Sequence, residues 1–151
     1  MLSNPQPRVM YVDDDEDSRE MLSLLLTLSQ IETKAVATAH QALRLMQAER
    51  FDLYLLDARL PDLDGFELCR RMRVFDLHTP IVFFSGAAYE ADKRRGIKAG
   101  ANAYITKPGV EDLLTSITRL ISYPENVTAD IIPFGRKTSF SSAFDFEPAA
   151  A

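Results

Sequence analysis

The chain of 151 residues is 46% hydrophobic and 26% charged, enough apolar material for one globular domain with a substantial core. Its formal net charge of −5 argues against a nucleic-acid surface, because such surfaces normally carry a basic stripe. A single cysteine excludes an internal disulfide, and the sequence shows neither a signal-peptide pattern nor an apolar run of membrane-spanning length. We therefore expect a cytoplasmic protein that contacts neither nucleic acid nor membrane.

Apolar runs of strand length alternate with helical periodicities along most of the chain. The runs predict strands at 9–12, 31–37, 53–56, 81–84 and 102–106. Apolar residues at helical spacing predict four helices, marked by Met21, Leu24, Leu25 and Leu28, by Ala39, Ala42, Leu43 and Met46, by Phe66, Cys69 and Met72, and by Val110, Leu113, Leu114, Ile117, Leu120 and Ile121. A fifth, weaker helix is predicted at residues 88–99, with Gly100 as its C-cap.

Five β/α units of this size predict an α/β fold, a doubly wound parallel sheet covered by helices on both faces. Strands that are buried on both faces read as nearly continuous apolar runs. The segments VMYV, LYLL and IVFF fit that description and are predicted to be central. The more polar segments IETKAVA and NAYIT are predicted to form the two edges.

Polar residues follow four of the five predicted strands. Asp13 and Asp14 follow the first strand, Asp57 the third, Ser85 the fourth and Lys107 the fifth. The carboxyl ends of parallel strands meet at one edge of a sheet, which is where open α/β sheets bind ligands. We therefore expect these side chains to converge on one site.

The chemistry that such a set supports is narrow. Three neighbouring carboxylates need a counter-charge, and Mg²⁺ prefers oxygen ligands. A carboxylate beside Mg²⁺ can accept a phosphoryl group as an acyl phosphate, while Ser85 and Lys107 can contact the phosphoryl oxygens. The sequence lacks a G-x-x-x-x-G-K phosphate loop, which disfavours nucleotide hydrolysis. The pattern predicts phosphoryl acceptance.

The acidic run at residues 13–17 has a second interpretation. Acids are favourable at the N-terminal end of a helix, and Asp15 or Asp17 can cap the helix that follows. From the local pattern alone, both a helix start and a cation site are open.

The stretches VMYVDDDED, FDLYLLDARLPDLDGFELCRRMR, PIVFFSGA and GANAYITKP occur in this order between residues 8 and 122. Together they resemble the receiver domain of two-component response regulators, of the stand-alone, chemotaxis-like type. The resemblance implies a flavodoxin-like, five-stranded sheet of order 2-1-3-4-5. It also implies an N-terminal segment at 1–7, a receiver domain at 8–122 and a C-terminal tail at 123–151.

The resemblance implies a role for each acid. Asp57 would be the phosphoacceptor and a metal ligand, Asp14 would bind Mg²⁺ directly, and Asp13 would bind it largely through water. The backbone carbonyl of Arg59 would be a further ligand. The remaining acids of the run would be ordinary helix-start residues, Asp15, Glu16 and Asp17.

The resemblance also assigns residues on the last two strands. Ser85 and Tyr104 would be the switch pair, with Tyr104 moving in from outside when Ser85 moves. Lys107 would bind the phosphate, followed by a cis peptide bond. Arg59 and Ala87, two residues beyond the acceptor and the serine, occupy positions that tune the lifetime of the acyl phosphate in this family.

The implied partners are a sensor histidine kinase or a histidine phosphotransfer protein, and a downstream protein that the sequence does not identify. The only catalysis expected is the domain's own phosphotransfer and autodephosphorylation. The residues after 122 are too few for a helix-turn-helix output domain, so we expect a stand-alone receiver in a chemotaxis system or phosphorelay. The phenylalanine-rich tail is expected to dock on the fourth helix, fifth strand and fifth helix of this chain or of a neighbour, which leaves homodimer formation open.

Two other functions compete with this one. A pseudo-receiver would be an interaction module that is never phosphorylated, and the complete set of rim residues argues against it. A haloacid-dehalogenase-like phosphatase normally needs a second aspartate two residues after its nucleophile, where this chain has Arg59.

Outside the rim, Cys69 is predicted to be a buried, inert thiol, and His40 and His78 are predicted to lie on the surface or in loops.

Overall fold

The computed structural model describes residues 5–122, and the tail at 123–151, with its predicted docking, lies outside them. The strands are β1 (Arg8–Val12), β2 (Glu32–Val36), β3 (Leu53–Leu56), β4 (Ile81–Ser85) and β5 (Ala103–Thr106). The helices are α1 (Glu16–Leu28), α2 (Ala39–Ala48), α3 (Gly65–Phe75), α4 (Glu90–Ala99) and α5 (Val110–Ser122).

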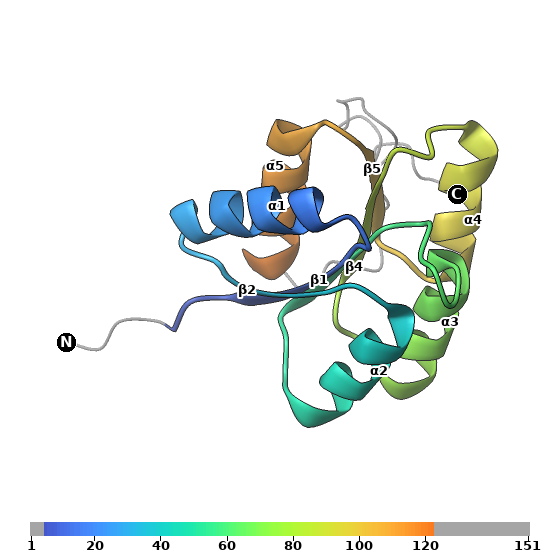
Figure 1. Ribbon diagram of the computed structural model, residues 1–151, viewed down its shortest axis with the longest axis horizontal. Helices are drawn as coiled ribbons and strands as arrows, with labels where there is room; N and C mark the ends of the chain where they lie inside the picture. The colour runs from blue at the N-terminus through green and yellow to red at the C-terminus, as the bar shows by residue number, and fades with distance from the viewer. Residues whose placement is uncertain (1–4, 123–151) are drawn as a thin grey trace, which may run out of the picture.

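The strands form one parallel sheet of order β2-β1-β3-β4-β5, which confirms the predicted topology and the two polar edge strands. Helices α1 and α5 cover one face of the sheet, and α2, α3 and α4 cover the other (Figure 1). Each face has its own apolar core, so the central strands β1, β3 and β4 are buried on both sides. This explains why they read as unbroken apolar runs.

The register of the strands aligns their carboxyl ends. Val12 of β1 lies opposite Leu56 of β3, and Leu56 lies opposite Phe83 of β4. The ladder continues one residue beyond β3, where the backbone N–H of Asp57 donates to the Val12 carbonyl at 2.9 Å. The residues that follow these strands therefore emerge at one edge of the sheet.

Helix α1 packs through a different face from the one predicted. Met21, Leu24 and Leu28 are 55%, 59% and 69% exposed, whereas Leu22 and Leu26 are buried against the sheet. Residues 21–28 contain six leucines or methionines, so two overlapping stripes both have helical spacing. The stripe that is buried depends on how the loop after β1 orients the helix, which the periodicity does not specify.

The ends of the helices follow the predicted capping chemistry. The Asp15 side chain accepts a hydrogen bond from the backbone N–H of Ser18 at 2.8 Å, and so caps α1. Gly100 ends α4 in the left-handed conformation, with φ of 119°. Helix α4 begins at Glu90, two residues later than predicted.

Within residues 5–122, no helix combines the length and the apolar character needed to cross a bilayer.

Arg73 of α3 connects the loops that precede β4 and β5, at the amino ends of the strands. Its Nε donates to the Gly100 carbonyl at 2.9 Å, one terminal nitrogen donates to the Thr79 carbonyl at 2.7 Å, and the other donates to Asn102 Oδ1 at 2.9 Å. Burial lowers the pKa of this guanidinium, so its hydrogen bonds offset a real desolvation cost.

We expect Arg73→Met to lower the free energy of unfolding by about 2–4 kcal/mol, because several acceptors lose a charged donor. Urea titration would measure the loss. Arg70→Met is the matched control on the same helix, since Arg70 is exposed and pairs with Glu67, and it should cost less than about 1 kcal/mol. Equal losses in the two variants would contradict a special role for the Arg73 hydrogen bonds.

Candidate functional site

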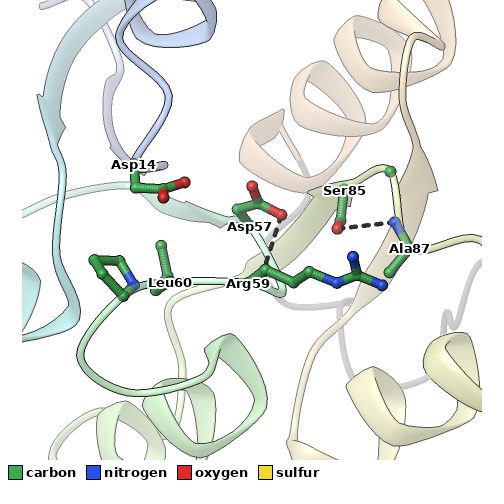
Figure 2. Close-up of a pocket in the computed structure, with 8 residues that line it drawn as sticks. Asp14, Asp57, Arg59, Leu60, Ser85 and Ala87 are labelled. Carbon is green, nitrogen blue, oxygen red and sulfur yellow. Dashed lines mark hydrogen bonds between the residues drawn. The ribbon is translucent and has the colours of Figure 1, made fainter.

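A cavity of about 380 Å³ opens at the carboxyl ends of β1, β3 and β4. Figure 2 shows the carboxylates of Asp14 and Asp57 pointing into the same space, with the Arg59 side chain running along the pocket toward Ala87. The lining residues come from the last residue of β4 and from the loops that follow β1, β3 and β4: Asp14, Asp57, Arg59, Leu60, Pro61, Ser85, Gly86 and Ala87. The structure thus brings together residues that lie more than 70 positions apart in the chain.

Three carboxylates form a cluster at this cavity, two of them in its lining and the third buried behind it. Asp13, Asp14 and Asp57 each offer an oxygen within 4.8 Å of the others, and the backbone N–H of Arg59 lies 3.4 Å from Asp57 Oδ1. Asp13 and Asp57 are buried, whereas Asp14 is exposed. An all-oxygen, anionic donor set with one open side suits a hard divalent cation such as Mg²⁺.

Electrostatics at Asp57 also favour a cation. Burial raises the pKa of Asp57 above its ordinary value, and the charge of Asp13 raises it further. Hydrogen bonding with Ser85 and the charge of Lys107 lower that pKa without cancelling the increase. The cluster therefore holds more negative charge than its protein neighbours neutralise, and a bound cation would supply the difference.

Lys107, from the loop after β5, is the cation that contacts the Asp13 and Asp57 carboxylates. Its Nζ lies 2.7 Å from Asp13 Oδ2 and 3.6 Å from Asp57 Oδ2. Burial lowers the pKa of Lys107, but the hydrogen bond to Asp13 and the charge of Asp57 outweigh this and raise it, so the ammonium stays charged. The peptide bond to Pro108 is cis, as predicted.

Ser85 and Tyr104 meet through the backbone of Ala87. The Ala87 N–H donates to Ser85 Oγ at 3.2 Å, and the Tyr104 hydroxyl donates to the Ala87 carbonyl at 2.6 Å. The Tyr104 ring is only 2% exposed and stacks on Phe83, with 5.4 Å between the ring centroids. We expected this ring to start outside the core, but in this conformation it already lies inside.

Tyr11 is a site residue that the sequence-based prediction missed. Its buried hydroxyl donates to Asp13 Oδ2 at 2.5 Å. Tyr11 precedes Asp13 by two positions at the end of a strand, and such residues share one face. That spacing was a usable signal, but in an apolar run the tyrosine reads as ordinary core.

A second missed contact fastens the loop that follows Asp57. The carboxylate of Asp62 accepts hydrogen bonds from the backbone N–H groups of Ala39 and His40, at 3.0 and 2.9 Å, and it also contacts His40 Nδ1. His40 is on the surface, as predicted, but it lies against this loop. The contact joins the loop to the N-terminus of α2.

We expect Asp62→Asn to lower stability by roughly 1 kcal/mol at pH 5, an amount reduced by solvent screening of this exposed contact. Partial burial raises the pKa of Asp62, but the hydrogen bonds from His40 and Ala39 dominate and lower it to about 2. A lowered carboxyl pKa stabilises the fold above the unfolded value of 3.8, and this stabilisation is lost as the pH falls toward 2.

Urea titrations between pH 5 and pH 2 would measure the difference between the two proteins. Asp17→Asn, which removes an exposed acid elsewhere, is the control. A wild-type advantage over Asp62→Asn that stays constant throughout this pH range would contradict the expected titration.

The other side chains noted in the sequence lie outside the site. Cys69 is fully buried in α3, and burial raises the pKa of its thiol to about 12, so it is inert as predicted. His78 is exposed in the loop before β4.

Comparison with known proteins identifies this architecture. The family described as the response regulator receiver domain matches residues 9–119. The chain belongs to this family. A receiver domain accounts for the fold and the acidic pocket, and the phosphatase and pseudo-receiver alternatives are not favoured.

Individual relatives agree with the family match. The chain is 32% identical over 130 residues to AfsQ1, a transcriptional regulatory protein of Streptomyces coelicolor, in a match that covers 85% of this chain and 57% of AfsQ1. It is 30% identical over 129 residues to CtrA, a cell cycle response regulator of Brucella ovis, covering 85% of this chain and 56% of CtrA. The chain thus spans little more than half the length of these curated relatives.

A solved structure shows the same fold. The CheY-like response regulator receiver domain protein of Methanospirillum hungatei superposes with a TM-score of 0.75 at 30% identity, covering 80% of this chain and 98% of that one. The compared region corresponds to the receiver domain and supports the five-stranded, doubly wound architecture.

Proposed function

We propose that this receiver domain accepts a phosphoryl group on Asp57 from the phosphohistidine of a sensor kinase or a phosphotransfer protein. The observation that carries the proposal is the clustering of Asp57 with two further carboxylates within 4.8 Å, beside the Lys107 ammonium at 3.6 Å and an open cavity. With a divalent cation bound to the carboxylates, that cation and Lys107 would together offer positive charge to the oxygens of a phosphoryl group.

In the proposed reaction a carboxylate oxygen of Asp57 attacks the phosphorus of the phosphohistidine. The O–P bond forms as the N–P bond breaks, and the imidazole nitrogen leaves with the electron pair and takes up a proton. Lys107 would neutralise one phosphoryl oxygen, and the Ser85 hydroxyl would donate to another. Autodephosphorylation is the attack of water on the same phosphorus, which releases inorganic phosphate and restores the carboxylate.

We assign the metal ligands to Asp13, Asp14, Asp57 and the backbone carbonyl of Arg59. Mg²⁺ in this place would offset the negative charge that gathers when a phosphoryl group approaches three carboxylates. Arg59 also reaches along the cavity toward Ala87 (Figure 2), so it is placed to limit the access of water to an acyl phosphate.

The switch would start at Ser85. Movement of its hydroxyl toward a phosphoryl group would break the contact with the Ala87 N–H, and Ala87 is also bonded to Tyr104. A change in the β4–α4 loop would therefore reach β5 and the surface of α4 as a shift between two packings.

Incubation of the wild-type protein with acetyl phosphate and Mg²⁺ tests the function, with intact-mass measurement as the readout. A single labile phosphoryl group on Asp57 is the expected result. Turnover of many equivalents would indicate a phosphatase, and an unlabelled protein would indicate a pseudo-receiver.

We further propose that residues 8–122 form the functional unit, that it works in the cytoplasm, and that it catalyses only its own phosphotransfer and dephosphorylation. Its downstream target would be a protein. Docking of the tail at 123–151 on this unit, or on a neighbouring copy in a homodimer, remains a proposal.

A further inference from the structure

The Asp13 carboxylate is fully buried and is held by three donors, two from neighbouring residues and one from the loop after β5. Its Oδ2 accepts from the Tyr11 hydroxyl at 2.5 Å and from Lys107 Nζ at 2.7 Å, and its Oδ1 accepts from the backbone N–H of Asp15 at 3.0 Å. Two of the three donors therefore share one oxygen.

The two donors on Oδ2 differ in their freedom to move. Lys107 has a flexible side chain that is 25% exposed, and its ammonium already lies 3.6 Å from Asp57. Tyr11 lies on β1 with no exposed surface, among the apolar residues that α1 and α5 bury against the sheet. Burial also raises the pKa of its hydroxyl, which remains a proton donor at neutral pH.

A phosphoryl group on Asp57 would change this balance. The Lys107 ammonium would be drawn away from Asp13 and toward the new dianion, because Asp57, which carries the phosphoryl group, is already a neighbour of Lys107. A buried carboxylate that loses a charged donor is costly unless another donor stays in place. The rigidly packed Tyr11 hydroxyl is positioned to be that donor.

We propose that Tyr11 is a positioning residue that holds the Asp13 carboxylate in place when Lys107 turns from Asp13 to the phosphoryl group on Asp57. This role rests on the proposed function of the site. Without the hydroxyl, Asp13 in the resting state would still accept hydrogen bonds from Lys107 and from the Asp15 N–H. In the phosphorylated state it would keep, of these three donors, only the Asp15 N–H. Removal of the hydroxyl should therefore weaken the phosphorylated state more than the resting one.

The test compares Tyr11→Phe with Tyr54→Phe. Tyr54 is also almost fully buried, and its hydroxyl donates to a carboxylate, Asp76 Oδ2, at 3.0 Å. It lies one register step from Tyr11 but in the core on the other face of the sheet, and its hydroxyl contacts the end of α3 rather than the site, so it serves as the matched control. Both variants lose one tyrosine hydroxyl bonded to an aspartate, but only one loses it at the site.

The measurement is the affinity for beryllofluoride, a phosphoryl mimic, at saturating Mg²⁺ by isothermal titration calorimetry, alongside thermal unfolding. We expect Tyr11→Phe to weaken beryllofluoride binding about tenfold, as suits a hydrogen bond to a charged group. Tyr54→Phe should keep wild-type affinity while losing thermal stability. Wild-type affinity in Tyr11→Phe would overturn the role of Tyr11, whereas a wild-type protein that binds no beryllofluoride would overturn the proposed function and this role with it.

A measurement on the wild-type protein covers the case in which Tyr11→Phe does not fold. The Cζ resonance of ¹³C-labelled tyrosine reports hydrogen bonding of the hydroxyl, and Tyr11 can be assigned by elimination with Tyr→Phe variants at the other tyrosines. We expect the Tyr11 resonance to keep its hydrogen-bonded position when Mg²⁺ and beryllofluoride are added. Movement to the position of a free phenol would overturn the proposal.

Discussion

Asp57→Asn is expected to abolish Mg²⁺-dependent phosphorylation by acetyl phosphate, because an amide lacks the anionic oxygen that attacks phosphorus. The protein should stay folded, and in metal-free buffer at neutral pH it should be more stable than the wild type. Burial raises the pKa of Asp57, so ionisation of this residue costs stability as the pH rises past 3.8, and asparagine avoids that cost. Each pKa unit corresponds to about 1.4 kcal/mol.

Intact-mass measurement and thermal unfolding with and without Mg²⁺ would check both results. Asp17→Asn removes the same charge from an exposed position in the first turn of α1, and should keep wild-type labelling. If Asp57→Asn acquires one labile phosphoryl group at the wild-type rate, Asp57 is not the acceptor.

Gly65→Ala is expected to have the largest effect on the structure of the site. Gly65 begins α3, and its N–H donates to the Ala58 carbonyl at 2.8 Å. A Cβ at this position would lie 2.1 Å from the carbonyl oxygen of Asp57 and 2.9 Å from the Ala58 Cα. These are backbone atoms of the acceptor loop, so the clash can be relieved only by displacing Asp57 or the start of α3.

We expect Gly65→Ala to cost about 3 kcal/mol of stability, as a severe overpacking does. Displacement of the acceptor by about 1 Å should also slow phosphorylation on the order of 100-fold. Gly86→Ala is the matched control for stability, because a Cβ on that glycine at the same edge of the sheet would meet nothing within 4 Å. Urea titration and phosphorylation kinetics would measure the two effects. Equal stability of the two variants would show that the close approach of Gly65 to Asp57 is unimportant.

Features that depend on local pattern could be predicted from the order of the residues alone. Unbroken apolar runs identified β1, β3 and β4 as the buried strands, because a strand with a helix layer on each face has no polar side. The spacing of Phe66, Cys69 and Met72 on α3, and of the apolar residues on α5, identified the faces that pack. The strand-end positions of Asp13, Asp57 and Lys107 indicated a shared site, because parallel strands in register end at one edge.

Features that depend on how elements are oriented against one another could be seen only in three dimensions. Two apolar stripes on α1 satisfy the same periodicity, and the packing of the helix on the sheet selected Leu22 and Leu26 over Met21, Leu24 and Leu28. In the sequence Asp62 looks like an ordinary loop residue, and its partners at the start of α2 are set by the distance between two segments that lie far apart in the chain. Hydrogen bonds of this kind require two side chains or loops to approach within 3 Å, a condition that periodicity and composition do not encode.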